Sequence, residues 1–255
     1  MIHGKERRMR RLLGADGRSL LIAVDHALTT GGAGGLSRMS DVLGAVVEGG
    51  ADGVVVHRGS AAHSMPTQRG TAMIVHLSGN TRLSPGGELK TRVCDPESAV
   101  ALGADAVSVH VTFGGGSQED RAALADLAKV AADCDRLGLP LLVMTYAAGN
   151  YETEPQRAEA VIHAGRAVAE LGADIVKTAH PGDEFIAELA ASIEVPVVIA
   201  GGEAEGSWDA YVASAKDAIG QGVAGLCVGR RVFGSPDVAG AVARLRSVVH
   251  GEQAS

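Results

Sequence analysis

The sequence predicts an α/β fold, a single (β/α)8 TIM barrel, and three observations carry that prediction. A phrase made of Gly, a small residue, Asp and an apolar run recurs along the chain. Eight apolar runs of strand length alternate with helical stretches. The length of 255 residues suits one barrel built from eight such units. An open, doubly wound sheet is the structural alternative, but no GxGxxG turn follows the first predicted strand.

The repeated phrase marks the passage from a helix into a buried parallel strand. Its glycine supplies the left-handed conformation that ends a helix, and its apolar run suits a strand covered on both faces. The copies are GGADGVVVH (49–57), LGADAVSVH (102–110), LGADIVKTA (171–179) and the looser QGVAGLCVG (221–229). The aspartates of the three close copies are expected at the strand starts, on the face that serves stability: Asp52, Asp105 and Asp174.

The remaining elements follow from apolar runs and helix signals. Four further strands are expected at 19–25, 72–77, 140–146 and 196–201. Helices are expected at 38–48, 118–137, 155–171, 183–192, 208–220 and 237–249, and a short one at 96–102 after an irregular loop at 78–94. Thr153 and Gln156 have capping-box spacing, and Ser235 precedes Pro236 as a predicted helix cap. We expect one domain over 1–255, with an N-terminal extension at 1–18 and a tail at 250–255.

Composition excludes several classes of function. A net charge of −7 argues against a nucleic-acid or anionic-membrane partner, and 3% aromatic residues leave few platforms for base stacking. No apolar run reaches the length of a membrane span. The three cysteines show no CxxC spacing, so a reducing cytoplasm is favoured over a disulfide framework.

The most informative single residue is Lys177, because it stands inside a predicted buried strand. Lysine is almost never fully buried unless it is paired or used in chemistry. Burial in an apolar barrel disfavours the ammonium form, so the pKa of Lys177 is expected to fall. The neutral amine could then attack a carbonyl and form a Schiff base. The alternative is a structural ion pair between Lys177 and Asp25.

Polar residues gather at the predicted carboxyl ends of the strands, where barrel active sites form. Asp25 and Tyr146 stand at two such ends and could move protons for Lys177. Glycine turns follow the seventh and eighth strands, where barrels commonly bind phosphate, and the second turn adds a guanidinium. The turns are Gly201-Gly202 and Gly229-Arg230.

With these residues in place, the chain resembles the class I aldolases of the DeoC/FbaB group. Within that group it is most similar to the 2-amino-3,7-dideoxy-D-threo-hept-6-ulosonate synthases and related dihydroxyacetone-phosphate aldolases. The matching phrases run in the same order over nearly the whole chain. They are AVDHALTTGG (23–32), IVHLSGNTRLSP (74–85), GADAVSVHV (103–111), ADIVKT (173–178), PVVIAGG (196–202) and VGRRVF (228–233).

The resemblance implies Lys177 as the Schiff-base lysine, Asp25 as proton acceptor and Tyr146 as proton donor. It implies a phosphorylated ketose donor, an aldehyde acceptor such as L-aspartate semialdehyde, no cofactor, no metal and a homo-oligomer. The reaction would be an aldolase or a transaldolase reaction. Substrate contacts are expected from His26, Thr29, His76, His110, Gly201, Gly202, Gly229 and Arg230.

One departure bears on the acceptor. The family commonly reads Tyr-Pro-Arg-Gly after the fifth strand, whereas this chain reads Tyr146-Ala147-Ala148-Gly149. If the missing arginine grips an anionic part of the substrate in relatives, this chain accepts a different acceptor. A simple dihydroxyacetone phosphate or fructose-bisphosphate aldolase is therefore the alternative within the family.

Three other hypotheses remain open at this point. His26, His57, His76 and His110 end four strands beside Asp25, and three imidazoles with a carboxylate could hold zinc. A sugar-phosphate isomerase or epimerase could use Asp25 as base and Lys177 as a non-covalent electrophile. A non-catalytic sugar-phosphate sensor could use the same barrel.

Overall fold

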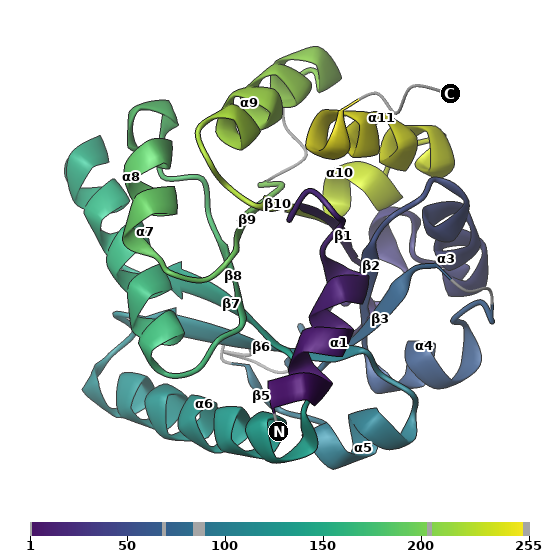
Figure 1. The fold of residues 1–255 in the computed structure, drawn as a ribbon, viewed down its shortest axis with the longest axis horizontal. Helices are drawn as coiled ribbons and strands as arrows, with labels where there is room; N and C mark the ends of the chain where they lie inside the picture. Colours follow the sequence, from purple (N-terminus) through teal and green to yellow (C-terminus); the bar gives the residue numbers. More distant parts are fainter. Residues whose placement is uncertain (1, 68–69, 84–89, 203–205, 252–255) are drawn as a thin grey trace.

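The computed structural model describes residues 2–67, 70–83, 90–202 and 206–251. Within them, parallel strands close into a barrel in the order β1-β10-β9-β8-β7-β6-β3-β2, with helices arranged around it (Figure 1). The predicted (β/α)8 barrel is confirmed. Its strands are β1 (Ser19–Ala23), β2 (Gly53–Val56), β3 (Ala72–His76), β6 (Ala106–Phe113), β7 (Leu141–Ala147), β8 (Ile175–Thr178), β9 (Val197–Ala200) and β10 (Gly225–Val228).

The helices that cover the barrel lie where the sequence predicts them. They are α3 (Met39–Glu48), α5 (Pro96–Ala101), α6 (Ser117–Leu137), α7 (Glu154–Glu170), α8 (Ile186–Ser192), α9 (Trp208–Gly220) and α11 (Val238–His250). The 3-10 turn η2 (Asp183–Phe185) precedes α8. None of the helices in the described ranges is long and apolar enough to cross a membrane.

Several short elements were not predicted. They are α2 (Ala27–Thr30), η1 (Ala33–Gly35), α4 (Arg58–His63), α10 (Arg230–Phe233) and the antiparallel pair β4 (Ser78–Gly79) and β5 (Thr91–Arg92). The basic segment of the predicted N-terminal extension forms helix α1 (Ile2–Leu12). The β4–β5 pair lies in the segment expected to be a loop, 78–94. Residues 84–89 of that segment and 252–255 of the predicted tail lie outside the described residues.

One of the two predicted helix caps is confirmed and the other is wrong. Thr153 Oγ1 accepts a hydrogen bond from Gln156 N, and Gln156 Oε1 accepts one from Thr153 N. Ser235 is not the cap of α11. The helix begins three residues later, because the Asp237 carboxylate accepts from Gly240 N, and Ser235 Oγ accepts from Asp237 N. A carboxylate at the right spacing outcompetes the Ser-Pro signal.

The repeated phrase builds the same joint in three places. Its aspartate accepts a hydrogen bond from the first backbone N–H groups of the neighbouring strand. Asp52 accepts from Leu20 N at 2.7 Å, Asp105 from Met73 N at 3.0 Å and Asp174 from Leu141 N at 2.8 Å. The helix-ending glycines take the expected positive φ: Gly50 (82°), Gly103 (85°), Gly172 (97°) and Gly222 (108°). The aspartates are therefore structural, as predicted.

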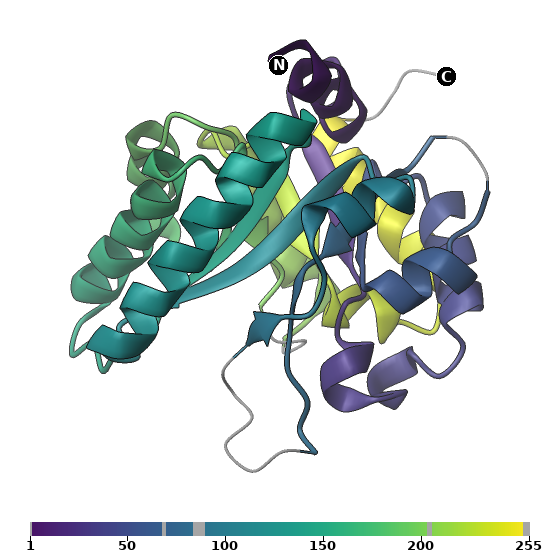
Figure 2. The same ribbon diagram turned by 90° about the horizontal axis from the view of Figure 1, so that it is seen from below.

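Helix α1 lies across one end of the barrel (Figure 2), and its ion pairs show that Asp105 and Asp174 lie at this same end. Lys5 forms ion pairs with Asp135 and Asp174, and Arg11 pairs with Asp105 at 2.5 Å. Leu12, at the end of the helix, is fully buried among residues of the barrel interior. This end of the barrel is closed by side chains, so the opposite end is the one left for ligands.

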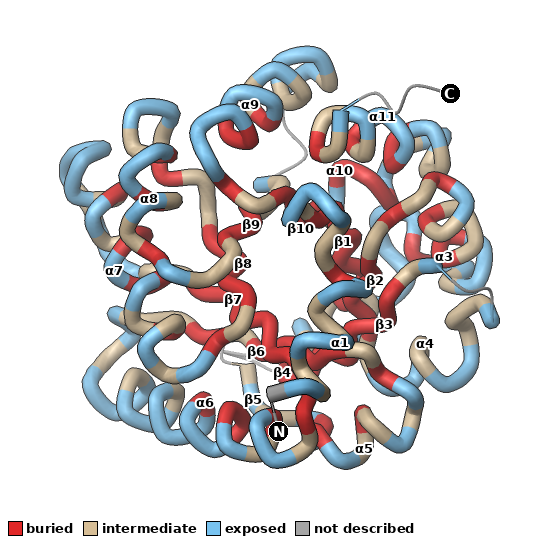
Figure 3. The backbone as a smooth tube through the Cα atoms, in the orientation of Figure 1, coloured by how far each residue is buried: buried red, intermediate tan, exposed pale blue. Residues whose placement is uncertain are grey.

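Two apolar clusters stabilise the fold. The larger lies between the outer face of the strands and the helices, and the smaller fills the barrel interior. Figure 3 shows this as buried strands ringed by helices that are exposed on their outer sides. The interior cluster contains Met144, Ile175 and Cys227. A side chain that points inward near the carboxyl ends of the strands therefore has apolar neighbours.

We expect Asp174→Ala to destabilise the barrel by about 1–3 kcal/mol, because it leaves the buried Leu141 N–H unsatisfied and removes an ion-pair partner of Lys5. Urea unfolding followed by circular dichroism measures the change. The control is Asp217→Ala on the exposed side of α9. An equal and small effect for both variants would contradict the structural role of Asp174.

Candidate active site

The predicted site residues lie at the carboxyl ends of the barrel strands, opposite α1. Lys177 belongs to β8, Tyr146 to β7, His76 to β3 and His110 to β6. Asp25 and His26 directly follow β1. The structure thus brings residues from distant parts of the sequence to one end of the barrel.

Lys177 points into the barrel because strand residues alternate in direction. Ile175 belongs to the interior cluster, and Val176 belongs to the outer cluster against the helices. Lys177, two residues after Ile175, faces inward and is only 6% exposed. Its Nζ lies 3.8 Å from Met144 Sδ, and Cys227 belongs to the same interior cluster as Met144. A thioether sulfur is a weak hydrogen-bonding partner for the amine.

The expected fall in the pKa of Lys177 is wrong for the resting site. Burial does lower this pKa, but Cys227, Tyr146 and Asp25 raise it by more. The pKa of Lys177 therefore lies above its ordinary value. The prediction counted the loss of hydration and missed the Asp25 carboxylate, which the fold brings near the ammonium. The Cys227 thiol, whose own pKa burial raises, adds a polar neighbour and no charge.

Asp25 supplies the fixed anion of the site. Its carboxylate is 7% exposed and lies 3.6 Å from His26 Nδ1 and 3.7 Å from His76 Nε2. Burial raises the pKa of Asp25, but His76, His26, Lys177 and Lys90 together bring it far below the ordinary value. Among the described residues, no carboxylate lies within 4.0 Å of Lys177 Nζ. The structural ion pair between Lys177 and Asp25 is therefore not formed.

His76, which is buried, and His110, which is partly buried, lie near Asp25 and Lys177 as neutral rings. His76 is fully buried, its Nδ1 is 2.8 Å from Ser108 Oγ, and burial lowers its pKa to about 3. His110 Nε2 is 2.8 Å from Thr112 Oγ1, and burial likewise lowers its pKa to about 3. The His110 ring stacks on Tyr146, with centroids 5.0 Å apart. Neutral imidazoles can donate or accept hydrogen bonds without adding charge.

The four strand-end histidines do not form a metal centre in the described ranges. His57 Nδ1 lies 3.3 Å from His76 O, and one ring nitrogen each of His76 (Nδ1) and His110 (Nε2) bonds to a hydroxyl group. Within those ranges, no three His, Cys, Asp or Glu side chains come together in a way that could hold one ion. The geometry does not support the zinc hypothesis.

A cleft of about 290 Å³ opens above the interior of the barrel between β7, β9 and β10. Glycine is required at two of its walls. A Cβ at Gly229 would lie 2.7 Å from Ala23 O, and one at Gly201 would lie 2.7 Å from Val228 Cγ1. Arg230 donates to Gly202 O at 3.3 Å, which joins the two predicted turns. The lining residues are His26, Tyr146, Ala179, His180, Ala200, Gly201, Gly202, Gly229 and Arg230.

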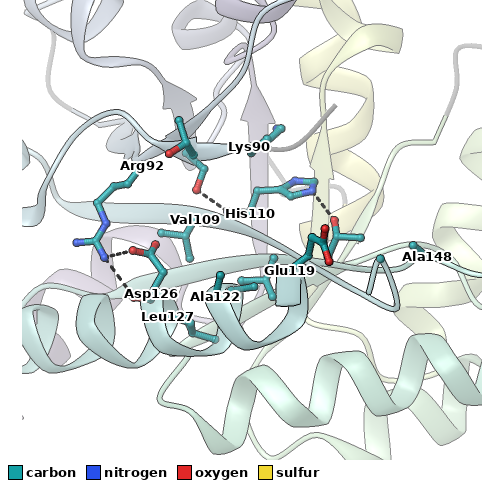
Figure 4. Close-up of a pocket in the computed structure, with 15 residues that line it drawn as sticks. Lys90, Arg92, Val109, His110, Glu119, Ala122, Asp126, Leu127 and Ala148 are labelled. Carbon is teal, nitrogen blue, oxygen red and sulfur yellow. Dashed lines mark hydrogen bonds and ion pairs between the residues drawn. The ribbon is translucent and has the colours of Figure 1, made fainter. Parts of the chain in front are cut away.

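Not every predicted contact residue lines this cleft. Thr29 lies in α2, and its hydroxyl donates to Asn80 Oδ1 at 2.8 Å, so it joins two loops. His110 lines a neighbouring cavity of about 650 Å³, which Figure 4 shows. Asp25, His76 and Lys177 are buried near the cleft rather than exposed in it. Whether Thr29 also contacts substrate stays a prediction.

Sequence reasoning missed several residues of the site. Met144 and Cys227 read as core residues, and only the strand register shows that Met144 lies beside Lys177. His180, three residues after Lys177, lines the cleft. Lys90 lies in the segment treated as an irregular loop. Lys90 lies directly before β5, part of a strand pair too short to predict, so no sequence signal pointed to it.

Comparison with known proteins agrees with this geometry. A model of the DeoC/LacD family of aldolases matches residues 19–235. A 2-amino-4,5-dihydroxy-6-oxo-7-(phosphonooxy)heptanoate synthase of Streptomyces griseus is 37% identical over 91% of this chain and 85% of its own length. A 2-amino-3,7-dideoxy-D-threo-hept-6-ulosonate synthase of Halobacterium salinarum is 37% identical over 98% and 92%.

The solved structures give the same result. The crystal structure of an archaeal fructose 1,6-bisphosphate aldolase is 27% identical, with a TM-score of 0.86 over 96% of this chain and 99% of that one. In a related archaeal structure the catalytic lysine is covalently bound to a carbinolamine intermediate, with 26% identity, a TM-score of 0.86 and the same coverage. With a family model over most of its length and relatives at 37% identity, the chain belongs to the DeoC/LacD family of aldolases.

Proposed function

We propose that this protein is a Schiff-base-forming class I aldolase that joins a phosphorylated ketose donor to an aldehyde such as L-aspartate semialdehyde. The observation that carries the proposal is Lys177. It is a buried lysine with no carboxylate within ion-pair distance in the described ranges, and it lies below an open cleft. A lysine held in this way is available for covalent chemistry.

The names of the relatives support the choice of substrates. Breaking the C4–C5 bond of 2-amino-4,5-dihydroxy-6-oxo-7-(phosphonooxy)heptanoate in the retro-aldol sense leaves two parts. One is the three-carbon ketone dihydroxyacetone phosphate. The other is 2-amino-4-oxobutanoate, which is aspartate semialdehyde. The second relative's name also carries a 2-amino group and a carboxylate on the acceptor half.

In the proposed first half-reaction, Lys177 adds to the donor ketone, and loss of water leaves an iminium ion. The iminium carries its positive charge on the nitrogen that was the ammonium. The surroundings that raise the pKa of Lys177 therefore also stabilise the iminium. The resting ammonium must lose a proton before it attacks, and that proton leaves through the open cleft or to Asp25.

In the second half-reaction, the iminium draws electrons from the neighbouring C–H bond, and Asp25 accepts the proton as the enamine forms. The enamine carbon attacks the acceptor aldehyde, and Tyr146 donates a proton to the new alkoxide. Water then hydrolyses the iminium and frees Lys177. Tyr146 lines the cleft and is held by stacking on His110, so its hydroxyl has a fixed orientation.

The cleft is suited to the phosphate of the donor. Its glycine turns let backbone N–H groups approach an anion, and Arg230 adds a charged group at its edge. His26 lines the same cleft, and His76 lies below it. Binding the phosphate there would place the ketone carbon near Lys177, so that orientation lowers the barrier.

A simple fructose-bisphosphate aldolase is the second candidate. A fructose-bisphosphate aldolase class 1 of Thermoproteus tenax is 29% identical over 94% of this chain and 93% of its own length. The donor half of the two reactions is the same, and only the acceptor differs. The higher identity to the synthases favours the amino-acid aldehyde.

We also infer a cytoplasmic homo-oligomer without nucleic-acid or membrane partners. Cys94, Cys134 and Cys227 are free and buried, which suits a reducing compartment. The net charge of −7 disfavours anionic partners. The oligomer rests on the family resemblance alone, and light scattering during size-exclusion chromatography tests it.

Lys177→Met should abolish adduct formation and turnover while the barrel stays folded. Dihydroxyacetone phosphate followed by borohydride should add one reduced donor to the wild type, on the peptide that contains Lys177. Intact-mass spectrometry and peptide mapping measure this, and Lys216→Met on the surface of α9 is the matched control. Turnover by a folded Lys177→Met protein would refute the covalent step.

Tyr146→Phe should lower kcat about 100-fold or more, because a positioned proton donor contributes about 10²–10⁴ in rate. The donor adduct on Lys177 should still form, since its bond does not involve the phenol. Steady-state rates and borohydride trapping separate the two steps. Tyr151→Phe, in the exposed loop before α7, is the control. Equal losses in adduct yield and rate would count against the role of Tyr146.

The buried neutral histidines should make the enzyme sensitive to acid. The folded pKa of His76 is about 3, whereas an unfolded histidine titrates near 6.5. Between these values the unfolded state binds more protons, so stability falls as pH falls below about 6.5. His76→Asn should lose about 2 kcal/mol less stability than the wild type from pH 7 to pH 5.

Urea unfolding at pH 7, 6 and 5 measures this difference. His3→Asn, at an exposed position on α1, is the control and should keep the pH slope of the wild type. An unchanged slope in His76→Asn would show that His76 is not the neutral buried ring described above.

A further inference from the structure

A cavity of about 650 Å³ is separate from the proposed donor cleft, because none of the residues that line the one is among the described residues that line the other. It lies between β6 and the first turns of α6, and β5 and the residue before it form another wall. Its volume is in the range of about 300–1,000 Å³ that is typical of small-molecule sites. Figure 4 shows Lys90, His110 and Glu119 from three different segments on its wall.

Lys90 gives the cavity a positive group. Its side chain is half-buried, and its ammonium has no hydrogen bond or ion pair with any described residue. Burial lowers the pKa of Lys90, the Asp25 carboxylate raises it and Lys177 lowers it again. Lys90 is thus close enough to interact electrostatically with both Asp25 and Lys177. A half-buried cation without a fixed counter-ion suits an anionic group on a ligand.

Glu119 gives the same cavity a negative group. It lies in the first turn of α6, is exposed, and makes no ion pair with a described cation. The other charged residues on the wall, Arg92 and Asp126, pair with each other. Among the described residues, the cavity therefore presents one unpaired cation, Lys90, and one unpaired anion, Glu119, to a ligand.

The part of the cavity wall that lies nearest to Tyr146 in the sequence is Ala148, a small and uncharged side chain. Ala148 lines the cavity two residues after Tyr146, and His110 connects the two, since it lines the cavity and stacks on the Tyr146 ring. A ligand in the cavity would have the proposed proton donor at its edge. The cation that recognises it would come from Lys90, in a different segment from Ala148.

We propose that this cavity binds the acceptor aldehyde, with Lys90 contacting its carboxylate and Glu119 contacting its ammonium group. The proposal rests on the proposed function and identifies residues that select the acceptor. A zwitterionic amino-acid aldehyde matches the two unpaired charges, whereas a phosphorylated aldehyde would bring a second anion toward Glu119. The donor phosphate belongs to the separate cleft at Arg230, which Lys90 does not line.

The experiment compares Lys90→Met and Glu119→Gln with the wild type in two stages. The first stage traps dihydroxyacetone phosphate on Lys177 with borohydride, without any acceptor. The second measures kcat/KM for L-aspartate semialdehyde, for succinate semialdehyde and for glyceraldehyde. These acceptors carry, in order, an ammonium with a carboxylate, a carboxylate alone, and neither charge. Lys129→Met and Glu188→Gln, both exposed and outside the cavity, are the controls.

Lys90→Met should keep the donor adduct and lose about tenfold or more of its preference for the two carboxylate acceptors over glyceraldehyde. Glu119→Gln should lose a similar factor only in its preference for L-aspartate semialdehyde over succinate semialdehyde. The controls should keep both preferences.

Unchanged preferences in both variants would overturn the proposal while leaving the aldolase function intact. A raised KM for the donor with unchanged acceptor preference would also overturn it, because Lys90 would then serve the donor phosphate. If the wild type forms no donor adduct in the first stage, the proposed function itself fails, and the two failures are thereby distinguished.

Discussion

The arrangement of this site depends on keeping one positive charge inside a closed barrel. The buried Lys177 ammonium loses its hydration, and the fold compensates by placing the Asp25 carboxylate near it but outside ion-pair distance. Asp25 lies beside His26 and His76, so its charge acts on Lys177 at a distance while the amine stays free of a salt bridge. In the proposed reaction the same field supports each cationic species on that nitrogen in turn.

This constraint explains the chemistry of the surrounding side chains. A further cation next to Lys177 would drive its proton off, and a further carboxylate would fix it as an ion pair. The site instead uses imidazoles that burial keeps neutral, and two sulfur atoms. The ion pairs that hold α1 against the barrel lie at the opposite end, where Lys5 pairs with Asp174 and Arg11 pairs with Asp105.

Much of the fold and site could be predicted because they follow from short-range patterns. The helix-ending glycines, the aspartate joints and the inward lysine each follow from residue type and spacing. The predicted cap at Ser235 was wrong because the Asp237 carboxylate, two residues later, caps the helix instead. The pKa of Lys177 and the place of Lys90 could not be predicted. Both depend on which side chains, far apart in the sequence, the closed barrel brings together. A single sequence does not give the distances between such side chains.

The division of the barrel into two faces also bears on how such an enzyme changes over evolutionary time. The strand joints and α1 hold the shape, while the second cavity is walled by α6 and by a strand pair that stands outside the barrel sheet. The wall residues of α6 and β5 take no part in the hydrogen bonds between barrel strands, so they can change without altering the pairing of those strands. In the proposed enzyme, selection could therefore change the acceptor at little cost in stability while the proposed covalent chemistry at Lys177 stays the same.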